Sequence, residues 1–234
     1  MEQQVFFQQL EARIAKYDLL CHPFYQAWTA GKLTREDLRK YAEDYYPHVK
    51  AFPTYLAEFA MRLEDGELRR AVLANMADEK GTEDTAGAPQ REHAELWLDF
   101  AEGMGSQRNL AGRTQSPAIK NLTKFFHQLA SEGSAEEALA AFYAYESQVP
   151  RVAKEKARGL QEMYGAGDKT SAYFTLHTTA DIYHSNVWRK QLEKRLQSHP
   201  EAMEKALAAG ENAAKALWEA LDGIEESRHA PQAA

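Results

Sequence analysis

The chain has 234 residues, of which 44% are apolar and 27% charged, and its net charge is −7. This is long enough for one sizeable core, and the mild acidity without a long basic run excludes nucleic acid and anionic membranes as expected partners. The single cysteine, Cys21, excludes an intrachain disulfide and a cysteine metal cluster. The first residues lack a secretory signal, and no apolar run approaches the roughly 20 residues of a membrane span, so we expect a cytoplasmic protein.

Apolar residues recur with helical spacing along almost the whole chain. They predict helices over residues 5–17, 23–30, 35–46, 48–63, 68–80, 89–102, 117–131, 136–164, 170–197 and 200–225. No segment alternates apolar and β-branched residues as a strand would. The sequence therefore predicts an all-α bundle, with residues 1–234 forming one domain and a frayed tail from about residue 227.

Proline and glycine place the expected breaks. Pro47 is expected to separate two helices, Pro53 to bend the second, and Pro150 to kink the helix over 136–164. The polar segment 81–89 is expected to be a loop or an interruption.

Three potential metal ligands lie close together in the helix predicted over 170–197. His177, Asp181 and His184 are spaced i, i+4 and i+7, which returns them to nearly one helix face. The flanking residues are largely apolar, so this face is expected to be buried, and buried imidazoles and carboxylates need partners. Imidazole and carboxylate are normal ligands of iron and manganese.

Further candidates come from other predicted helices, and each has an ordinary reading as well. Glu146 lies among apolar residues and is either a ligand or part of a salt bridge. His93, taken alone, is more often a hydrogen-bonded core histidine, and Glu79 alone reads as a charge at a helix end. Together the six residues would suffice for two metal ions, in an O2-dependent iron or manganese enzyme or in a dizinc or dimanganese hydrolase.

Several longer stretches resemble a known family in the same order along residues 5–220. They are 22–28 (HPFYQAW) with Gly31, 45–49 (YYPHV), 93–103 (HAELWLDFAEG), 145–150 (YESQVP), residues 156–165, and the segment with His177, Asp181 and His184. The chain resembles the Chlamydia protein associating with death domains (CADD) and its bacterial relatives, within the haem-oxygenase-like TenA/PqqC superfamily.

The resemblance implies a haem-oxygenase-like helical bundle with a dimetal centre of two iron ions or of one manganese and one iron. It implies p-aminobenzoate synthesis for folate, with a tyrosine of the enzyme as the source of the ring, a lysine as amino donor, and O2 and a reductant as co-substrates. The implied metal ligands are Glu79, His93, Glu146, His177, Asp181 and His184. Tyr25 would be the sacrificed tyrosine and Lys156 the amino donor, and Tyr41, Tyr145 and Tyr173 would be further catalytic tyrosines near the centre that could relay radicals.

The spacing of the first ligand departs from the family pattern. The family's glutamate lies about two helical turns before the histidine, whereas Glu79 precedes His93 by fourteen residues, with Gly87 and Pro89 between them. Either the chain has an insertion here or Glu83 replaces Glu79. We favour Glu79, because residues 75–79 resemble the segment that leads into the family's glutamate.

Two other functions remain open at this point. One is a haem-oxygenase-like diiron oxidase that acts on a free fatty acid or amino acid, which a long apolar tunnel would favour. The other is an interaction protein, although the sequence has no evident docking stripe to support death-domain binding. The resemblance also implies a homodimer.

Overall fold

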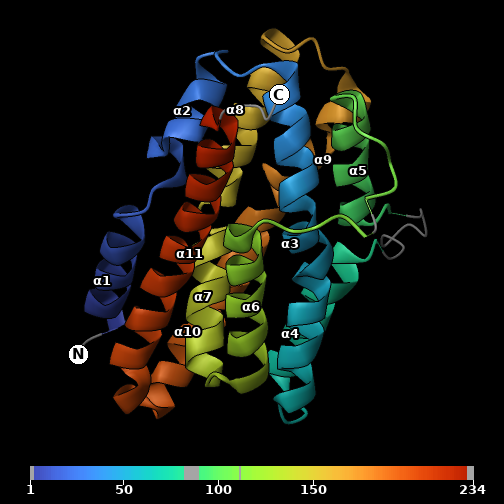
Figure 1. The fold of residues 1–234 in the computed structure, drawn as a ribbon. Coiled ribbons are helices and arrows are strands. Elements are labelled where there is room, and N and C mark those ends of the chain that lie inside the picture. Colours follow the sequence, from blue (N-terminus) through green and yellow to red (C-terminus); the bar gives the residue numbers. More distant parts are fainter. Residues whose placement is uncertain (1–2, 82–89, 111, 231–234) are drawn as a thin grey trace.

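The computed structural model describes residues 3–81, 90–110 and 112–230. These ranges hold the α-helices α1 (Gln3–Ala15), α2 (Pro23–Thr29), α3 (Arg35–Arg62), α4 (Glu67–Glu79), α5 (His93–Gly103), α6 (Pro117–Glu132), α7 (Ala135–Glu146), α8 (Val149–Glu162), α9 (Asp168–His177), α10 (Ala180–Ser198) and α11 (Met203–His229) (Figure 1). Short 3₁₀ helices cover Leu19–Cys21 and Pro200–Ala202. No strand occurs in the described ranges, so the all-α prediction is confirmed. The expected loop at 82–89, with the alternative ligand Glu83, lies outside them.

Capping residues begin several helices where the sequence provides them. Thr34 and Asp37 form a reciprocal capping box at the start of α3, and Ser134 and Glu137 do the same at α7. Ser116 caps α6 immediately before Pro117. Local side-chain chemistry therefore fixes these three starts.

The prediction that Pro47 separates two helices is wrong. Helix α3 runs without interruption from Arg35 to Arg62 and contains both prolines. A proline in a helix interior costs about 3 kcal/mol, but burial of a large side chain returns a comparable amount. Residues such as Tyr41 and Phe52 bury the faces of α3 on both sides of the prolines, and this packing outweighs the local cost.

Two long helices predicted from periodicity are each divided. The pattern over 136–164 becomes α7, which ends at Glu146, and α8, in which Pro150 occupies the first turn instead of kinking a continuous helix. The pattern over 170–197 becomes α9 and α10, separated at residues 178–179. The C-terminal helix continues to His229, past the point where fraying was expected, and residues 231–234 are outside the described ranges.

The helices pack around a contiguous cluster of buried apolar side chains. Helix α7 packs against α10 and α11, α3 packs against α4, α5 and α6, and α9 lies against α5 and α8 (Figure 1). Aromatic rings fill much of the space between α3, α5 and α9, with Trp28, Trp97 and Phe100 fully enclosed. None of the described helices is both long and apolar enough to cross a lipid bilayer.

Candidate metal centre

The six predicted ligands converge from five different helices, mostly at helix ends. Glu79 ends α4, His93 begins α5, Glu146 ends α7, His177 ends α9, and Asp181 and His184 lie in the first two turns of α10. Each is at most 5% exposed. The break at residues 178–179 means that His177 does not share a helix with the other two, which corrects the expectation of one continuous helix.

The possible ligand atoms form two overlapping groups. Donor atoms of Glu79, His93 and His177 lie within 4.8 Å of one another, and so do those of Glu79, Glu146 and His184. Glu79 belongs to both groups, and its Oε2 is 2.9 Å from Nδ1 of His93. A carboxylate shared by two groups of possible ligands would suit two neighbouring cations.

Asp181 completes the region without belonging to either group of three. One of its carboxylate oxygens is 3.4 Å from Nδ1 of His184, and the residue lines a cavity of about 10 Å³ together with Glu79, Glu146 and His177. Four of the six candidate ligands therefore border the same small space, and His93 and His184 lie beside it through their contacts with Glu79 and Asp181.

Unpaired polar atoms test whether this site suits metal ions. Within the described residues, Oδ2 of Asp181 is buried without a hydrogen-bond partner, and Nδ1 of His93 and of His184 make no hydrogen bond of good geometry although carboxylate oxygens lie 2.9 Å and 3.4 Å away. Such atoms cost free energy unless a partner compensates them. Cations would provide that compensation, so the residues present fit a metal centre with imidazole and carboxylate ligands.

Neighbouring groups orient the histidine rings. The Tyr173 carbonyl oxygen lies 2.6 Å from Nδ1 of His177 and leaves Nε2 as the available nitrogen. Oδ2 of Asp78 lies 3.2 Å from Nε2 of His184, so Nδ1 remains on the side of Asp181. Outer hydrogen bonds of this kind usually fix the tautomer and direction of a ligating histidine.

Glu146 is held by two donors, the Trp188 indole nitrogen and the Asn75 amide, which is 3.3 Å from Oε1. Burial raises the pKa of Glu146 well above its usual value. For Glu79, burial acts in the same direction, but the nearby histidines, His93 above all, outweigh it and the pKa of Glu79 is lowered. The two carboxyl groups therefore have different affinities for a proton within one pocket.

The predicted tyrosine and lysine of the reaction form a second cluster beside the first. Lys156 Nζ donates to the Tyr25 hydroxyl at 2.7 Å and to the Tyr41 hydroxyl at 2.6 Å, and the two hydroxyls are 3.1 Å apart. Nζ also lies 4.2 Å from the centre of the Tyr25 ring. The three residues come from α8, α2 and α3.

The surroundings of Lys156 favour an uncharged amine. The residue is 6% exposed, and no carboxylate in the described part of the chain lies within 4 Å of Nζ. Burial alone lowers the pKa of Lys156 well below its usual value. Burial raises the pKa of Tyr25 and of Tyr41, so both phenols keep their protons at neutral pH.

Tyr145 and Tyr173 lie between the two groups. The Tyr173 ring stacks on the His177 ring with 4.0 Å between their centres. Both tyrosines line the 10 Å³ cavity at the ligands and a cavity of about 30 Å³ that also contacts Tyr25 and Lys156. The structure thus brings all eleven predicted site residues into one region, as two adjoining clusters.

Sequence reasoning missed four supporting residues, Asn75, Asp78, Trp97 and Trp188. Three of them lie one helical turn from a predicted ligand in the same helix, namely Asn75, Trp97 and Trp188. Spacing of i±4 from each ligand would have identified these three as neighbours.

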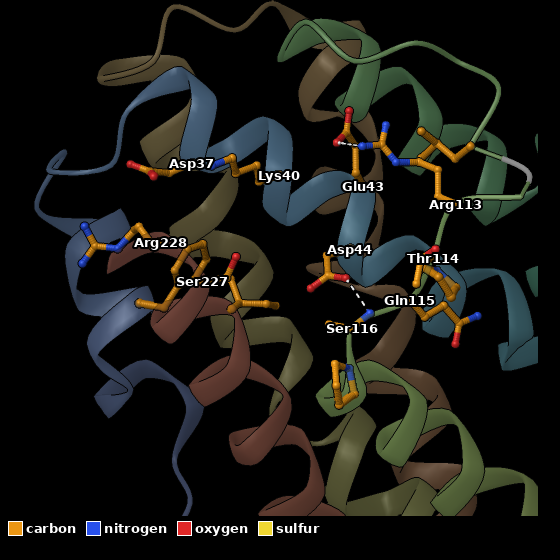
Figure 2. Close-up of a pocket in the computed structure, with 15 residues that line it drawn as sticks. Asp37, Lys40, Glu43, Asp44, Arg113, Thr114, Gln115, Ser116, Ser227 and Arg228 are labelled. Carbon is orange, nitrogen blue, oxygen red and sulfur yellow. Dashed lines mark hydrogen bonds and ion pairs between the residues drawn. The ribbon is translucent and has the colours of Figure 1, made fainter. Parts of the chain in front are cut away.

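A separate cavity of about 390 Å³ lies between α3, the segment after α5 and the end of α11 (Figure 2). Its charged groups are already paired: Arg113 bonds Glu43 at 2.7 Å, and Asp44 accepts from the Ser116 backbone at 3.3 Å. None of the six candidate ligands lines it, although Phe24, the neighbour of Tyr25, does. It is therefore distinct from the metal centre.

Comparison with known proteins agrees with this geometry. Residues 39–218 match the family described as iron-containing redox enzymes. The chain is 39% identical to a 4-aminobenzoate synthase of Nitrosomonas europaea, covering 97% of this chain and 94% of that one. It is 36% identical to a 4-aminobenzoate synthase of Chlamydia pneumoniae, covering 92% of each chain.

A solved structure with a haem-oxygenase-like fold, from Shewanella denitrificans, superimposes with a TM-score of 0.79 at 16% identity, covering 97% of this chain and 94% of that one. The predicted haem-oxygenase-like fold is confirmed by this similarity. The chain therefore belongs to the haem-oxygenase-like family of iron-containing redox enzymes that includes the 4-aminobenzoate synthases of Chlamydia and Nitrosomonas.

Proposed function

We propose that this protein is a metal- and O2-dependent p-aminobenzoate (4-aminobenzoate) synthase that uses Tyr25 as the source of the ring and Lys156 as the amino donor. The observation that carries the proposal is the contact between them: Lys156 Nζ is 2.7 Å from the Tyr25 hydroxyl, inside a buried cluster without a carboxylate partner among the described residues. The names of the relatives support the same product.

The atoms of a tyrosine side chain map onto the product directly. In p-aminobenzoate the amino group is para to the carboxylate, and in tyrosine the hydroxyl is para to Cβ. Formation of the product from Tyr25 therefore breaks the Cα–Cβ bond, leaving glycine at position 25, and replaces the ring C–O bond, whose oxygen leaves as water, with a bond to Nζ of Lys156. The Nζ–Cε bond then breaks with oxidation of Cε to an aldehyde. Cβ is oxidised to a carboxylate, and dioxygen is the oxidant.

The Lys156 amine is suited to form the new bond. An amine attacks a ring carbon only when it is uncharged, and burial favours that form here. Its position beside the hydroxyl-bearing end of the Tyr25 ring selects that carbon over other ring positions.

We assign the metal ligands to Glu79, His93, Glu146, His177, Asp181 and His184, for two iron ions or for one manganese and one iron. When bound, these ions supply the O2-dependent one-electron oxidation that the ring and Cβ require. The protein residues keep the pocket closed to bulk water, since every ligand is almost completely buried.

The size of the internal cavities argues against a free substrate. The spaces beside Lys156 and beside the ligands measure about 30 Å³ and about 10 Å³. Cavities this small hold about one water molecule, whereas ligand pockets usually measure about 300–1,000 Å³. The alternative of an oxidase for a free fatty acid or amino acid requires a larger space at the same position.

Labelling tests the origin of the product. The protein is produced with ring-labelled tyrosine, loaded with iron(II) without oxygen, and exposed to O2 and a reductant. We expect labelled p-aminobenzoate and loss of the ring from the peptide that contains residue 25. Tyr25→Phe should form no product and bind the same amount of metal, while Tyr143→Phe, a buried tyrosine outside the cluster, should behave as the parent protein. Unlabelled product would show that Tyr25 is not the source of the ring and would contradict the proposal.

We also propose one domain for residues 1–234, a homodimer, and a cytoplasmic role in folate synthesis. The contiguous buried core supports a single domain. Sedimentation of the purified protein tests the dimer.

A further inference from the structure

A surface groove between α4 and α10 reaches the edge of the metal centre. It measures about 360 Å³, and the candidate ligand His184 and its neighbour Asn75 form part of its wall. Nδ2 of Asn75 lies 3.3 Å from the Glu146 carboxylate, so this wall contacts the ligand set from outside. Two other large cavities, of about 390 Å³ and about 640 Å³, are lined by none of the six candidate ligands. A molecule bound in this groove therefore lies next to the ligands.

The residues of the two helices explain the hollow. On α4, Ala71 and Ala74 line the groove and leave room that longer side chains would fill, while Tyr183 and Val187, one turn apart on α10, form the opposite wall. The Tyr183 side chain is 66% exposed, and its ring centre lies 5.9 Å from that of the His184 ring. An exposed aromatic ring beside a metal ligand offers a surface on which another flat ring can stack.

Two cations line the groove farther along the same helices. Arg70 and Lys190 both contact it, and neither forms an ion pair with a residue that the structure describes. The acidic residue of the wall, Glu67, is already bound by Lys194 at 2.7 Å and by Gln191 at 2.9 Å. This part of the groove is therefore positively charged, and it suits an anionic group.

We propose that the groove binds the reductant of the reaction, and that this reductant is a flat-ring electron donor with an anionic side chain, the chemistry of reduced flavin mononucleotide. Lys190 follows Tyr183 by seven residues, which is about 10 Å along a helix. The ring of the donor stacks on Tyr183 beside His184, and its phosphate lies between Arg70 and Lys190. The inference rests on the proposed function, because that reaction requires electrons from outside the protein.

The step at this site is an electron transfer in which no bond to the protein forms or breaks. The reduced flavin gives up two electrons, one at a time, and returns to its oxidised form. Each electron lowers the oxidation state of one metal ion by one. The hydroquinone protons of the flavin pass to solvent through the open side of the groove, and the oxidised flavin leaves the same way.

Binding is measured on the iron(II)-loaded protein under argon, where both partners are already reduced and no electron transfer follows. Titration calorimetry with reduced flavin mononucleotide should show saturable binding. Arg70→Gln/Lys190→Gln should weaken it by about tenfold, because the phosphate loses two cationic contacts. Reduced riboflavin, which has the same ring and no phosphate, should bind the parent protein and the double variant equally.

Matched variants control for charge and for the ring. Arg69→Gln/Lys215→Gln removes the same charge outside the groove, where Arg69 pairs with Asp65 and Lys215 with Glu219, and should bind as the parent protein does. Tyr183→Ala should weaken the binding of both flavins, whereas Tyr183→Phe, which keeps a flat ring, should retain it.

A rate measurement connects the groove to the metal centre. The iron-loaded protein is oxidised and then mixed with reduced flavin mononucleotide without oxygen. In Arg70→Gln/Lys190→Gln the flavin concentration that gives half the maximal rate of iron reduction should rise by about tenfold. Dithiothreitol, an uncharged reductant, should reduce the iron of the parent protein and of the double variant at the same rate.

Two results would overturn the inference: no saturable binding of reduced flavin mononucleotide, or equal affinity in the parent protein and in Arg70→Gln/Lys190→Gln. Saturable binding of ascorbate in place of the flavin would also overturn it, because a small anion does not span the distance from Tyr183 to Lys190. Flavin binding by a protein that forms no p-aminobenzoate would overturn the proposed function and leave the groove supported. Formation of p-aminobenzoate without flavin binding would overturn the groove alone.

Discussion

The two clusters at the centre of this bundle are both buried, but their electrostatic requirements are opposite. The ligand cluster gathers three carboxylates and three imidazoles at helix ends and leaves buried atoms unpaired. The Tyr25–Tyr41–Lys156 cluster contains hydroxyls and one amine that satisfy one another through short hydrogen bonds. The first cluster would therefore be completed by cations, whereas the second is complete with its groups uncharged.

This difference indicates how one core can hold redox chemistry and a nucleophile together. A cation beside Lys156 would be compatible with a neutral amine, and a carboxylate beside it would favour the charged one. The structure keeps the carboxylates on the far side of Tyr145 and Tyr173, which line the cavities next to both clusters. The tyrosines thus separate the two environments and still connect them.

The largest expected effect comes from removing the carboxylate shared by the two ligand groups. Glu79→Gln should bind fewer than about one metal ion per chain, because both groups lose a charged ligand. His93→Ala belongs to one group and should lose about one ion. Metal analysis after anaerobic loading measures both.

Glu64→Gln, which changes an exposed glutamate before α4, is the control and should retain the parental metal content. Equal metal content in Glu79→Gln and the parent protein would show that Glu79 is not a ligand and would favour Glu83 instead.

A smaller effect is expected from Asp78, which contacts the ligand His184 without facing the centre itself. Asp78→Asn should weaken metal binding by about tenfold, because the His184 ring loses the charged partner at Nε2 that orients it. Competition with a chelator measures the change, and Asp78→Glu should restore part of it.

Asp65→Asn removes the same charge from a 93% exposed side chain and controls for net charge. If Asp78→Asn and Asp65→Asn bind metal equally well, Asp78 does not position His184.

Most of the fold and part of the candidate site could be predicted from the sequence. Helical periodicity located the helices, but it did not show the break between His177 and Asp181, because both sides of the break carry the same apolar pattern. The prediction that His177 and Asp181 lie close together still holds, because both residues line the same cavity despite the break at residues 178–179. Continuity of α3 through Pro47 depends on packing with distant segments, which no local pattern contains.

The contact between Tyr25 and Lys156 shows more clearly what sequence analysis could not predict. The residues are separated by 131 positions, and nothing in either local segment points to the other. Only the resemblance to the CADD family paired them, and the structure places them within hydrogen-bond distance. Asp78 had no such guide, because its importance follows from its contact with His184 and not from its residue type.

The smallest expected effect concerns stability, and it tests the charge state of the second cluster. An unfolded lysine titrates near pH 10.4, and burial lowers the pKa of Lys156 in the folded protein well below its ordinary value. Between these two pKa values the unfolded chain binds more protons, so the free energy of unfolding rises with pH across that window.

Lys156→Met removes this titration and keeps the packing volume. From pH 7 to pH 9 the free energy of unfolding of the parent protein should therefore rise relative to that of Lys156→Met, by at most about 1.4 kcal/mol per pH unit, in denaturant unfolding. Lys154→Met, at an exposed position two residues before Lys156 on the opposite face of α8, should run parallel to the parent protein. Parallel pH profiles for the parent and Lys156→Met would mean that the buried amine is charged, which would remove the nucleophile from the proposed reaction.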